Sequence, residues 1–363
     1  MKSVLVGIGQ AGGKLSTALA EFDEQMGFGA VRSALAVNTA AADLQSVPFE
    51  TVLIGQDAVG GHGVGGDNER GAEIMQDDAD QVLDALNGRI TSETEAIFVV
   101  AGLGGGTGSG GAPVLVRRLS RIYDVPVYAL GVLPGSDEGA LYQVNAGRSL
   151  KTLAGEADAV LLIDNDAWKA ETESLSEGYE AINENIARRV GLLLAAGEAT
   201  NGVAESVVDS SEIINTLRSG GIAALGYASA PAAEEAAENI SLITSTTRNA
   251  VLTGSSLPGA TTADAALVVV AGQPERISRK GVEKARRWVE EETDSMQVRG
   301  GDFPIDSSRL ASLVLLGGLE RSDRVERFFA RAEQAASEAE AVEVSGATEA
   351  EKTFQNDELD GLF

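Results

Sequence analysis

The sequence predicts a two-domain α/β protein, with a mostly parallel sheet covered by helices, then a long central helix, then a smaller α+β domain. Three observations lead to this prediction. The 363 residues exceed what one hydrophobic core usually supports. In the first half, near-continuous apolar runs alternate with helical patterns, which is typical of a parallel sheet covered on both faces. After a long amphipathic stretch, the composition shifts toward Ala and Ser, which marks a second region.

The first region opens with a strand pattern, Ser3 to Gly9, that ends in glycines and is followed by a helical pattern, Lys14 to Phe22. Further apolar runs predict strands over 33–37, 51–54, 96–101, 127–133 and 159–163. Helical periodicity predicts helices over 69–86 and 113–123. Strands that alternate with helices in this way predict the connections of a parallel sheet.

A long helix is predicted from Ser176 to Ala196, because apolar residues recur there at three- and four-residue steps. It ends near Gly197, before the turn 200–202. Beyond it, the sequence predicts helices over 210–217, 232–251, 281–291 and 321–335, and strands over 266–271, 296–303 and 313–316. The expected division is a first domain (1–170), the central helix (171–198), a second domain (199–335) and a tail (336–363).

The tail is acidic and poor in apolar residues from 337 to 358, so we expect it to be disordered. It closes with the apolar residues Leu359, Leu362 and Phe363. Apolar side chains on a flexible tether are suited to docking in the groove of a partner protein. A frayed end without function is the alternative.

Charge and composition exclude several classes of function. The formal net charge of −27 repels phosphate backbones and anionic lipids, so nucleic acid and bare membrane are not expected partners. Acidic residues spread along most of the chain suit a very salty cytoplasm, and an ordinary acidic cytosolic protein is the alternative. The absence of Cys and the single histidine, His62, exclude disulfides, thiolate zinc sites and multi-histidine metal sites. No apolar run approaches the roughly 20 residues that span a bilayer, and we expect the protein in the cytoplasm or at the inner face of the cell envelope.

The first glycine motif, Gly7 to Gly12, matches the dinucleotide fingerprint GxGxxG directly after a strand. Its glycines permit a tight turn, and the N-terminus of the following helix attracts a phosphate. An oxidoreductase that binds NAD(P) is therefore one hypothesis. That class also needs an acid for the ribose hydroxyl about 20 residues on, at the end of the second strand. The second strand ends in Asn38 instead, so this motif alone is weak evidence.

A second glycine motif is stronger, because Gly104-Gly105-Gly106-Thr107-Gly108-Ser109-Gly110 follows a buried strand and precedes a helix. So many glycines carry an entropic cost, and a backbone cradle for anionic oxygens gives a reason for them. A flexible linker is the alternative, although linkers do not usually occupy such a place. The chain has no GxxxxGK[ST] motif, so the phosphate-binding lysine of that class is missing. Helix dipoles and a metal ion must hold the phosphates instead.

This second motif resembles the GGGTG[ST]G signature of the tubulin and FtsZ superfamily, and the chain is most similar to its haloarchaeal CetZ branch, over roughly residues 1 to 325. The resemblance implies a tubulin/FtsZ-like fold that binds GTP or GDP with Mg²⁺ on an ordered series of loops. In the signature loop it implies nucleotide contacts from Gly104, Gly105, Gly106, Thr107 and Gly108.

The other phosphate loops of the family also have counterparts in this chain. By resemblance, the first loop contributes Gly9, Gln10, Ala11, Gly12 and Lys14. Gln10 stands where tubulins carry a magnesium-associated glutamine, so it is the expected metal-site residue. By the same resemblance, the γ-phosphate loop contributes Gly65, Gly66 and Asp67.

The resemblance also implies contacts to the ribose and the base. Glu138 is the expected acceptor for the ribose hydroxyls in the loop that runs to Tyr142, and Asn165 lies near the base. On the long helix, Tyr179 stacks on the base and Asn183 reads the guanine. Residues four apart share one helix face, which fits this pairing. Core packing of Tyr179 and plain solvation of Asn183 are the alternatives.

Two acids of the second domain complete the resemblance. Asp209 and Glu212 match the catalytic loop of the family, which inserts two acids into the nucleotide site of the neighbouring subunit. The resemblance implies that they orient and polarise the water that attacks the γ-phosphate. Asp209 also fits the position of a helix cap, and both roles are compatible.

The resemblance therefore predicts a GTPase that polymerises head to tail into filaments and whose active site is completed between subunits. Turnover is expected to be slow and to depend on assembly, and the expected role is cytoskeletal control of cell shape. Lys14, Tyr142 and Val207 depart from the FtsZ pattern and count against a division-ring FtsZ. A non-hydrolysing, GTP-bound scaffold and the NAD(P)-dependent oxidoreductase remain as alternatives.

Overall fold

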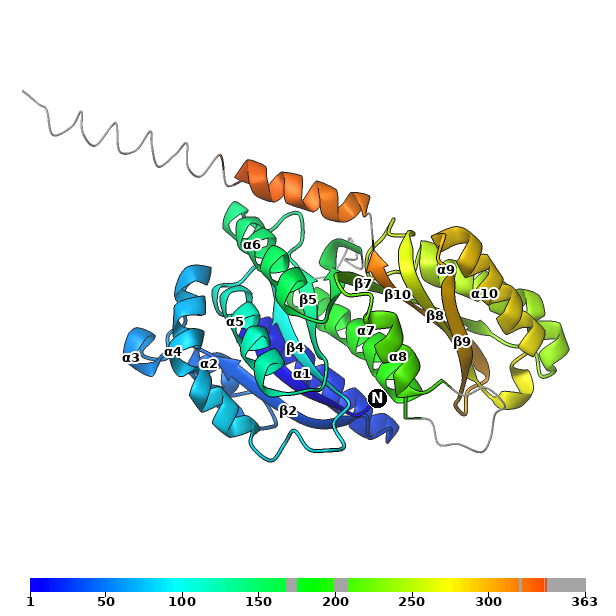
Figure 1. Ribbon diagram of the computed structural model, residues 1–363, viewed down its shortest axis with the longest axis horizontal. Coiled ribbons are helices and arrows are strands. Elements are labelled where there is room, and N and C mark those ends of the chain that lie inside the picture. Colours follow the sequence, from blue (N-terminus) through cyan, green and yellow to red (C-terminus); the bar gives the residue numbers. More distant parts are fainter. Residues whose placement is uncertain (168–174, 199–207, 320–321, 336, 338–363) are drawn as a thin grey trace, which may run out of the picture.

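The computed structural model describes residues 1–167, 175–198, 208–319, 322–335 and 337. Two blocks of structure lie on either side of a long helix, α7 (Figure 1). The strands are β1 (Ser3–Ile8), β2 (Val31–Asn38), β3 (Thr51–Leu53), β4 (Ala96–Gly102), β5 (Val127–Leu133), β6 (Ala159–Asp164), β7 (Ile222–Pro231), β8 (Ala263–Gly272), β9 (Gln297–Pro304) and β10 (Arg309–Leu319).

The α-helices are α1 (Gly9–Met26), α2 (Ala41–Leu44), α3 (Gln56–Val59), α4 (Asn68–Leu86), α5 (Gly106–Ile122), α6 (Ala140–Glu156), α7 (Leu175–Ala196), α8 (Ser210–Leu217), α9 (Ile240–Leu252) and α10 (Arg279–Thr293). Short 3-10 helices are η1 (Asn165–Ala167), η2 (Ala236–Asn239) and η3 (Pro274–Arg276). A further helix, here called the C-terminal helix, covers 323–335.

The strands form one sheet in the order β3-β2-β1-β4-β5-β6-β7-β10-β8-β9. The strands from β3 to β7 in this order run parallel. β10 runs antiparallel to both of its neighbours, β7 and β8. The strand order reverses between β1 and β4, and in open α/β sheets a ligand binds at the carboxyl ends of the strands at such a point.

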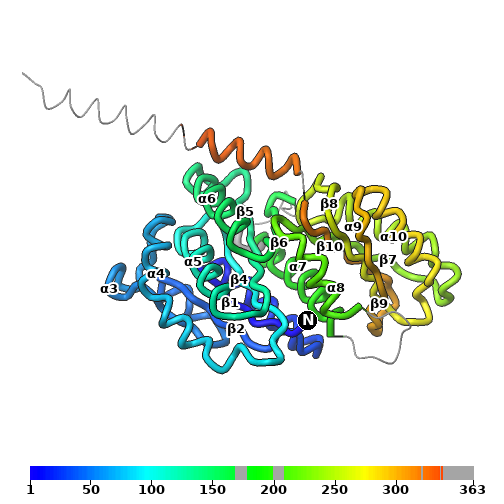
Figure 2. The backbone as a smooth tube through the Cα atoms, in the orientation of Figure 1, coloured from blue at the N-terminus to red at the C-terminus, as the bar shows by residue number. Residues whose placement is uncertain are grey.

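Helices cover both faces of the first seven strands. α1 and α7 pack on one face, where Leu15, Leu19 and Ile186 join a core with Phe98 and Leu130. α4, α5 and α6 pack on the other face. The C-terminal helix lies over α6 (Figure 2), and its Phe328 is buried in that second core.

The second domain shares one of these cores. In β8, Leu267 and Val269 face α7 and α8 and belong to the core of α1 and α7. Their neighbours Val268 and Val270 face the opposite way, into a separate core with α9 and α10. The period of two along a strand thus buries β8 on both faces, and it ties the second domain to the central helix.

Most elements predicted from the sequence are confirmed, including the long helix, which is α7. Two of the longer elements were not predicted, and neither were the short helices α2, α3, η1 and η3. β7 is rich in Ala, Gly and Ser, which are poor strand signals, and α6 begins inside the segment that was expected to be a loop to Tyr142. One helix begins later than predicted, since α9 starts at Ile240 instead of near residue 232. The expected disorder of 336–363 falls outside the described residues, apart from residue 337.

α5 begins earlier than predicted, at Gly106 instead of near Pro113, so most of the signature motif is helical. Close contact between two helix backbones explains glycines there. A Cβ on Gly110 would lie 2.0 Å from the backbone oxygen of Asn68, and one on Gly71 would lie 2.4 Å from the oxygen of Gly106. The N-terminal turns of α4 and α5 therefore touch backbone to backbone.

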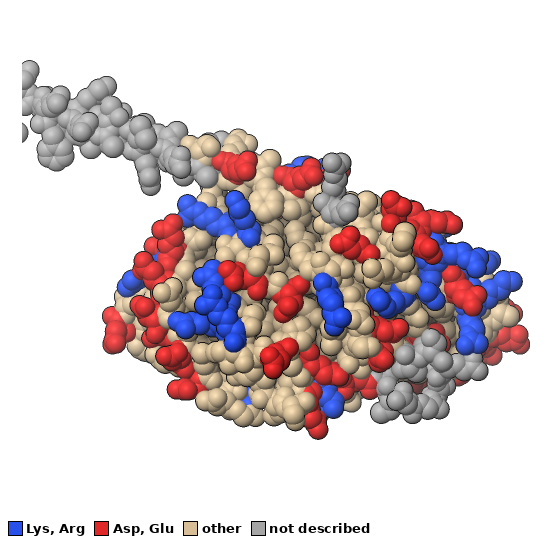
Figure 3. Space-filling model, viewed as in Figure 1, with Lys and Arg blue, Asp and Glu red and all other residues tan. Residues whose placement is uncertain are grey.

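The surface agrees with the acidic composition. On the face shown in Figure 3, acidic side chains are spread over both blocks, with Lys and Arg side chains among them. Within the described residues, no helix has both the length and the hydropathy to cross a membrane.

Candidate functional site

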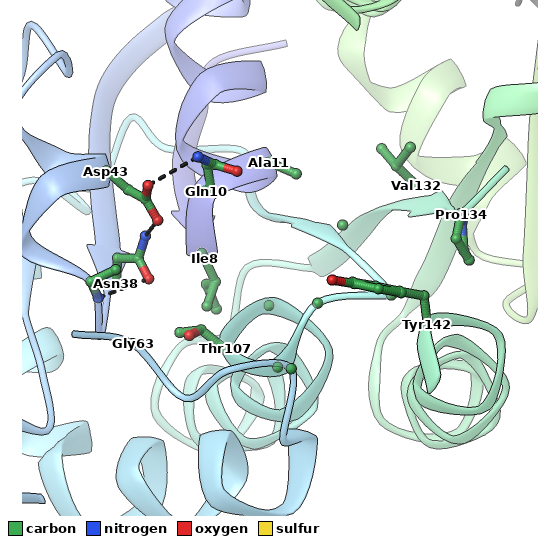
Figure 4. A pocket seen from close by; sticks show the side chains of 18 of the residues that line it. Ile8, Gln10, Ala11, Asn38, Asp43, Gly63, Thr107, Val132, Pro134 and Tyr142 are labelled. Carbon is green, nitrogen blue, oxygen red and sulfur yellow. Dashed lines mark hydrogen bonds between the residues drawn. The ribbon is translucent and has the colours of Figure 1, made fainter. Parts of the chain in front are cut away.

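A cavity of about 510 Å³ opens at the point where the strand order reverses. Its walls come from the carboxyl ends of β1, β4 and β5 and from the loop after β6, with Ile8, Gly102, Leu133 and Asn165 among the lining residues. Figure 4 shows the ring of Tyr142 on the opposite side of this cavity from Gln10 and Asp43. The size is that of a ligand pocket for a small molecule.

The structure brings most of the predicted contact residues together around this cavity. Those that line it are Gly9, Gln10, Ala11, Lys14, Gly65, Gly66, Gly104, Gly105, Gly106, Thr107, Gly108, Glu138, Tyr142, Asn165, Tyr179 and Asn183. They come from segments that are far apart in the sequence. The predicted contacts that do not line it are Gly12 and Asp67.

Gly12 and Asp67 have structural positions instead. A Cβ on Gly12 would lie 2.2 Å from the backbone oxygen of Val100, so this glycine lets α1 pack directly on β4. Asp67 is the N-cap of α4, and its Oδ1 accepts a hydrogen bond of 2.9 Å from the backbone N–H of Arg70. Both residues therefore hold α1 and α4 in place next to the cavity without lining it.

Two helices begin at the cavity wall without a side-chain cap. The N-cap of α1 is Ile8 and that of α5 is Gly105, and neither makes a side-chain capping bond. The first N–H groups of a helix lack intrahelical partners, and the helix dipole adds positive potential there. By contrast, α4 and α8 are capped by the carboxylates of Asp67 and Asp209. The cavity is therefore suited to phosphate groups.

A carboxylate that sequence reasoning missed lies at the edge of these helix ends. Asp43 Oδ1 accepts a hydrogen bond of 2.9 Å from Gln10 Nε2, and its Oδ2 accepts one of 3.0 Å from Asn38 Nδ2 (Figure 4). Asp43 lies on the short helix α2, and it lines the cavity. An acid at the end of β2 is the feature of a dinucleotide site, and this chain has Asn38 there. The acid comes five residues later, where α2 turns it back toward Asn38.

Glu138 and Tyr179 meet at another wall of the cavity. Glu138 Oε1 accepts a hydrogen bond of 2.7 Å from the backbone N–H of Gly135 and one of 3.3 Å from the Tyr179 hydroxyl. Burial and the Glu138 carboxylate raise the pKa of Tyr179 to about 12. The Tyr179 side chain is still 38% exposed, so it is not packed in the core. Asn183, one turn further along α7, lines the same cavity.

Asn165 is held between two aspartates. Asp164 and Asp166 on either side of it both accept hydrogen bonds from Arg324, at the start of the C-terminal helix. Burial would raise the pKa of Asp166, but the Ser136 N–H and the Arg324 guanidinium outweigh it and lower this pKa. The Asn165 Oδ1 is buried and has no hydrogen-bond partner among the described residues. This oxygen is free to accept a hydrogen bond from a ligand.

The two acids expected to be catalytic do not line the cavity of their own chain. Asp209 caps α8, where its Oδ1 accepts a hydrogen bond of 3.1 Å from the backbone N–H of Glu212, as the alternative role expected. Hydrogen bonding by Ser211 lowers the pKa of Asp209. Burial, followed by the charge of Asp209, raises the pKa of Glu212. Asp209 is exposed and Glu212 is half-buried, so a second molecule can reach them.

Two family models match this chain from end to end of its folded part. The tubulin/FtsZ family GTPase domain matches residues 2–173, and the tubulin-like CetZ C-terminal domain matches residues 172–334. The chain is 69% identical over 363 residues to the tubulin-like protein CetZ2 of Haloferax volcanii, which covers 100% of both chains. The chain belongs to the CetZ group of the tubulin/FtsZ family.

Solved structures of CetZ proteins share the fold. The chain is similar to CetZ2 from Haloferax volcanii in a GTPγS-bound protofilament, with a TM-score of 0.91 and 71% identity over 94% of this chain and 100% of that one. It is also similar to the GDP-bound monomer of CetZ1 from the same organism, with a TM-score of 0.85 and 47% identity over 93% of this chain and 100% of that one. The tubulin/FtsZ-like fold predicted from the signature loop is confirmed.

In the CetZ group the two glycine motifs belong to the same domain and the same site. GxGxxG and the signature loop both fall inside the match to the tubulin/FtsZ GTPase domain, and residues of both line one cavity. The hypothesis of an NAD(P)-dependent oxidoreductase is therefore not supported. Asn38 stands at the end of β2, where an NAD(P)-binding enzyme needs an acid, and in this fold it donates a hydrogen bond to Asp43.

Proposed function

We propose that this protein binds GTP in the cavity and hydrolyses it slowly, when a second copy stacks head to tail and lends Asp209 and Glu212. The observation that carries the proposal is the separation of the two parts. Within one chain the cavity holds the phosphate-binding helix ends, while the acids lie on α8 and do not line it. A heterologous contact that repeats would bring each cavity to the acids of the next molecule and build a filament.

The nucleotide would lie with its phosphates at α1 and α5 and its base at α7. The uncapped N–H groups of α1 and α5 would hold the phosphates, with the chain of glycines allowing close approach. Glu138 would accept from the ribose hydroxyls. Tyr179 would stack on the base, and Asn183 and the free oxygen of Asn165 would bond its polar edge. GDP would occupy the same contacts without the terminal phosphate.

Gln10 and Asp43 are the residues that would hold Mg²⁺. Magnesium prefers oxygen ligands and is usually bound through one or two carboxylates plus substrate phosphates. Asp43 supplies such a carboxylate beside the helix ends, and Gln10 is oriented by it. No group of three or more His, Cys, Asp and Glu side chains that could hold a metal occurs in the described part of the chain, which fits an ion held largely by phosphates. When bound, the ion neutralises phosphate charge in the transition state.

The raised pKa of Glu212 suits a group that exchanges a proton with water. Burial and the neighbouring Asp209 both disfavour its charged form. In the carboxylate form it would orient and polarise the attacking water, while Asp209, whose pKa is lowered, stays ionised beside it. A non-hydrolysing scaffold would need neither acid at the neighbour's cavity.

Mixing two inactive variants tests the shared active site. Glu212→Ala keeps the cavity and lacks an acid, and Gly105→Asp keeps the acids and blocks the phosphates. In a random mixture, about one interface in four joins an intact cavity to intact acids, so phosphate release should return at roughly a quarter of the wild-type rate. Light scattering at high salt, with GTP against GDP, follows assembly in the same samples.

Three outcomes of this experiment would overturn the proposal. The first is wild-type phosphate release that rises only linearly with protein concentration. The second is a mixture that stays inactive although each variant co-assembles with wild type. The third is Glu212→Ala with an unchanged rate of phosphate release.

We further propose the division into 1–170, 171–198, 199–335 and 336–363, and a cytoplasmic filament that controls cell shape, at the inner face of the envelope. The support is the family membership and the charge of −27, which disfavours direct lipid contact. A partner protein would dock on the apolar end of the tail. Deletion of residues 338–363 tests that docking, because shape control should be lost while GTP turnover of the purified protein persists.

A further inference from the structure

One buried amide joins the two glycine loops that face the phosphate end of the cavity. Asn145, on α6, is 1% exposed. Its Nδ2 donates a hydrogen bond of 2.7 Å to the backbone oxygen of Gly66 and one of 3.0 Å to the backbone oxygen of Gly104. An amide nitrogen carries two hydrogens, so each carbonyl can receive its own.

The helix around Asn145 packs against the same two loops. A Cβ on Gly66 would lie 3.0 Å from Leu141 Cδ2, and one on Gly104 would lie 3.1 Å from Tyr142 Cβ. One turn beyond Asn145, Arg148 forms an ion pair of 3.0 Å with Glu69, in the first turn of α4. Thus α6 contacts the 63–66 loop and the helix α4 that follows it, and it also contacts the signature loop.

These contacts make the gap between the loops depend on Asn145. A loop whose N–H groups serve a ligand still has carbonyl groups to satisfy, and a buried carbonyl without a partner is costly. Asn145 satisfies one carbonyl of each loop from a single nitrogen. Because both bonds start from one atom, a movement of either loop lengthens a bond or moves the other loop with it.

We propose that Asn145 is a positioning residue that fixes the separation of the 63–66 loop and the signature loop, and so favours a triphosphate over a diphosphate. The inference rests on the proposed function, and it adds that the 63–66 loop, which belongs to the γ-phosphate loop of the family resemblance, holds the terminal phosphate. A diphosphate would be bound mainly by the N-termini of α1 and α5, so its affinity should depend little on the separation of the two loops. A triphosphate must contact both loops, so its affinity should depend on that separation.

The affinities of GTPγS and GDP for Asn145 variants, measured with Mg²⁺ at high salt, test the proposal. Asn145→Ala removes both bonds and should weaken GTPγS binding about tenfold, or about 1.4 kcal/mol, with GDP affinity changed less than threefold. Asn145→Asp turns a carboxylate toward two carbonyls and should weaken GTPγS binding further. Asn145→Ser, which keeps one donor, should lie between wild type and alanine, and it serves if the other variants do not fold.

Arg148→Ala is the matched control, because it removes an exposed ion pair from the same face of α6 and should leave both affinities within twofold. The proposal is overturned if folded Asn145 variants lose affinity for both nucleotides by one factor, or for neither. Wild-type protein that binds neither nucleotide would instead refute the proposed function. Thermal unfolding of each variant separates lost folding from lost selectivity.

Discussion

Arg324 holds both carboxylate oxygens of Asp164, although 160 residues separate them in the sequence. Arg324 Nη2 lies 2.9 Å from Asp164 Oδ1, and its Nε bonds the other oxygen. The same guanidinium bonds Asp166, which accepts the backbone N–H of Ser136 at 2.9 Å. The C-terminal helix is thereby tied to the segment around Asn165 and, through Asp166, to the loop after β5.

Replacing Arg324 with alanine should lower both stability and nucleotide affinity. It leaves the buried Asp164 without its cation, and breaking such a pair costs about 3 kcal/mol of unfolding free energy. GTPγS and GDP should lose affinity by the same factor, because the loops concerned face the base and ribose that both share. Isothermal titration and thermal unfolding measure the two effects. Arg70→Ala, which breaks an exposed pair with Glu73, is the control and should change stability by less than about 0.5 kcal/mol.

Gly105→Asp should stabilise the protein and abolish GTP binding. Gly105 is the N-cap of α5, its φ of −72° and ψ of 169° suit any residue, and a Cβ there meets nothing within 4 Å. An aspartate would cap the free N–H groups and complement the dipole, which is worth about 0.5 kcal/mol. It would also occupy the place of a phosphate. A rise in melting temperature with unchanged GTP affinity would show that the phosphates do not use this helix end; Gly105→Ala controls for the added side chain.

Asp209→Asn should separate the cap of α8 from the chemistry. Asparagine caps a helix about as well as aspartate, so stability should change by only a few tenths of a kcal/mol. Phosphate release should still fall, because the negative charge is lost. Asp209→Ala should lose both the helix cap, which costs about 1 kcal/mol of unfolding free energy, and phosphate release. Full activity in the asparagine variant, measured on assembled protein, would leave Asp209 with a structural role alone.

The pH dependence of phosphate release should report Glu212. Its pKa is raised, chiefly by burial and then by Asp209, and in the proposed mechanism the carboxylate is the active form. Release should therefore fall as the pH drops through a midpoint above that of an ordinary glutamate. In Asp209→Asn the repulsive charge is gone, so the midpoint should move to lower pH even though the rate is smaller. A midpoint that stays in place would contradict the assignment, and light scattering at each pH controls for lost assembly.

Asp43→Ala should raise the Mg²⁺ concentration needed for half-maximal phosphate release. The variant removes a carboxylate and frees the Gln10 amide that it orients. GDP binding in the presence of a chelator should change little, because the phosphates still meet the helix ends. The control is Asp57→Ala, an acid of α3 that does not line the cavity. An unchanged magnesium requirement would remove Asp43 from the metal site.

Much of the cavity could be predicted because its residues follow one another in short motifs. Tight turns and helix starts are encoded locally, so Gly9, Gly105 and Gly108 could be assigned from their neighbours alone. The roles of Tyr179 and Asn183 came from the family resemblance, and helix geometry agrees with it because residues four apart share one helix face. These local rules also led to the family signature that proved correct.

The residues that sequence reasoning missed act through partners far away in the chain. Asn145 bonds residues 79 and 41 positions away, and Arg324 bonds one 160 positions away. Nothing in the local sequence marks Asn145, and α6 itself was not predicted. β7 was missed for a different reason, since its small residues gain strand structure from pairing with β10 and not from their own propensity.

The crossing of α4 and α5 decides where this nucleotide site can be altered. With no side chain between the two backbones at Gly110, any larger residue must force the helices apart in a single step. Gradual adjustment falls to the rim, where Lys14, Tyr142 and Tyr179 carry side chains that can be trimmed atom by atom. Variants designed to raise or lower the rate of GTP hydrolysis in the proposed filament should therefore change the rim residues and keep the glycines of the crossing.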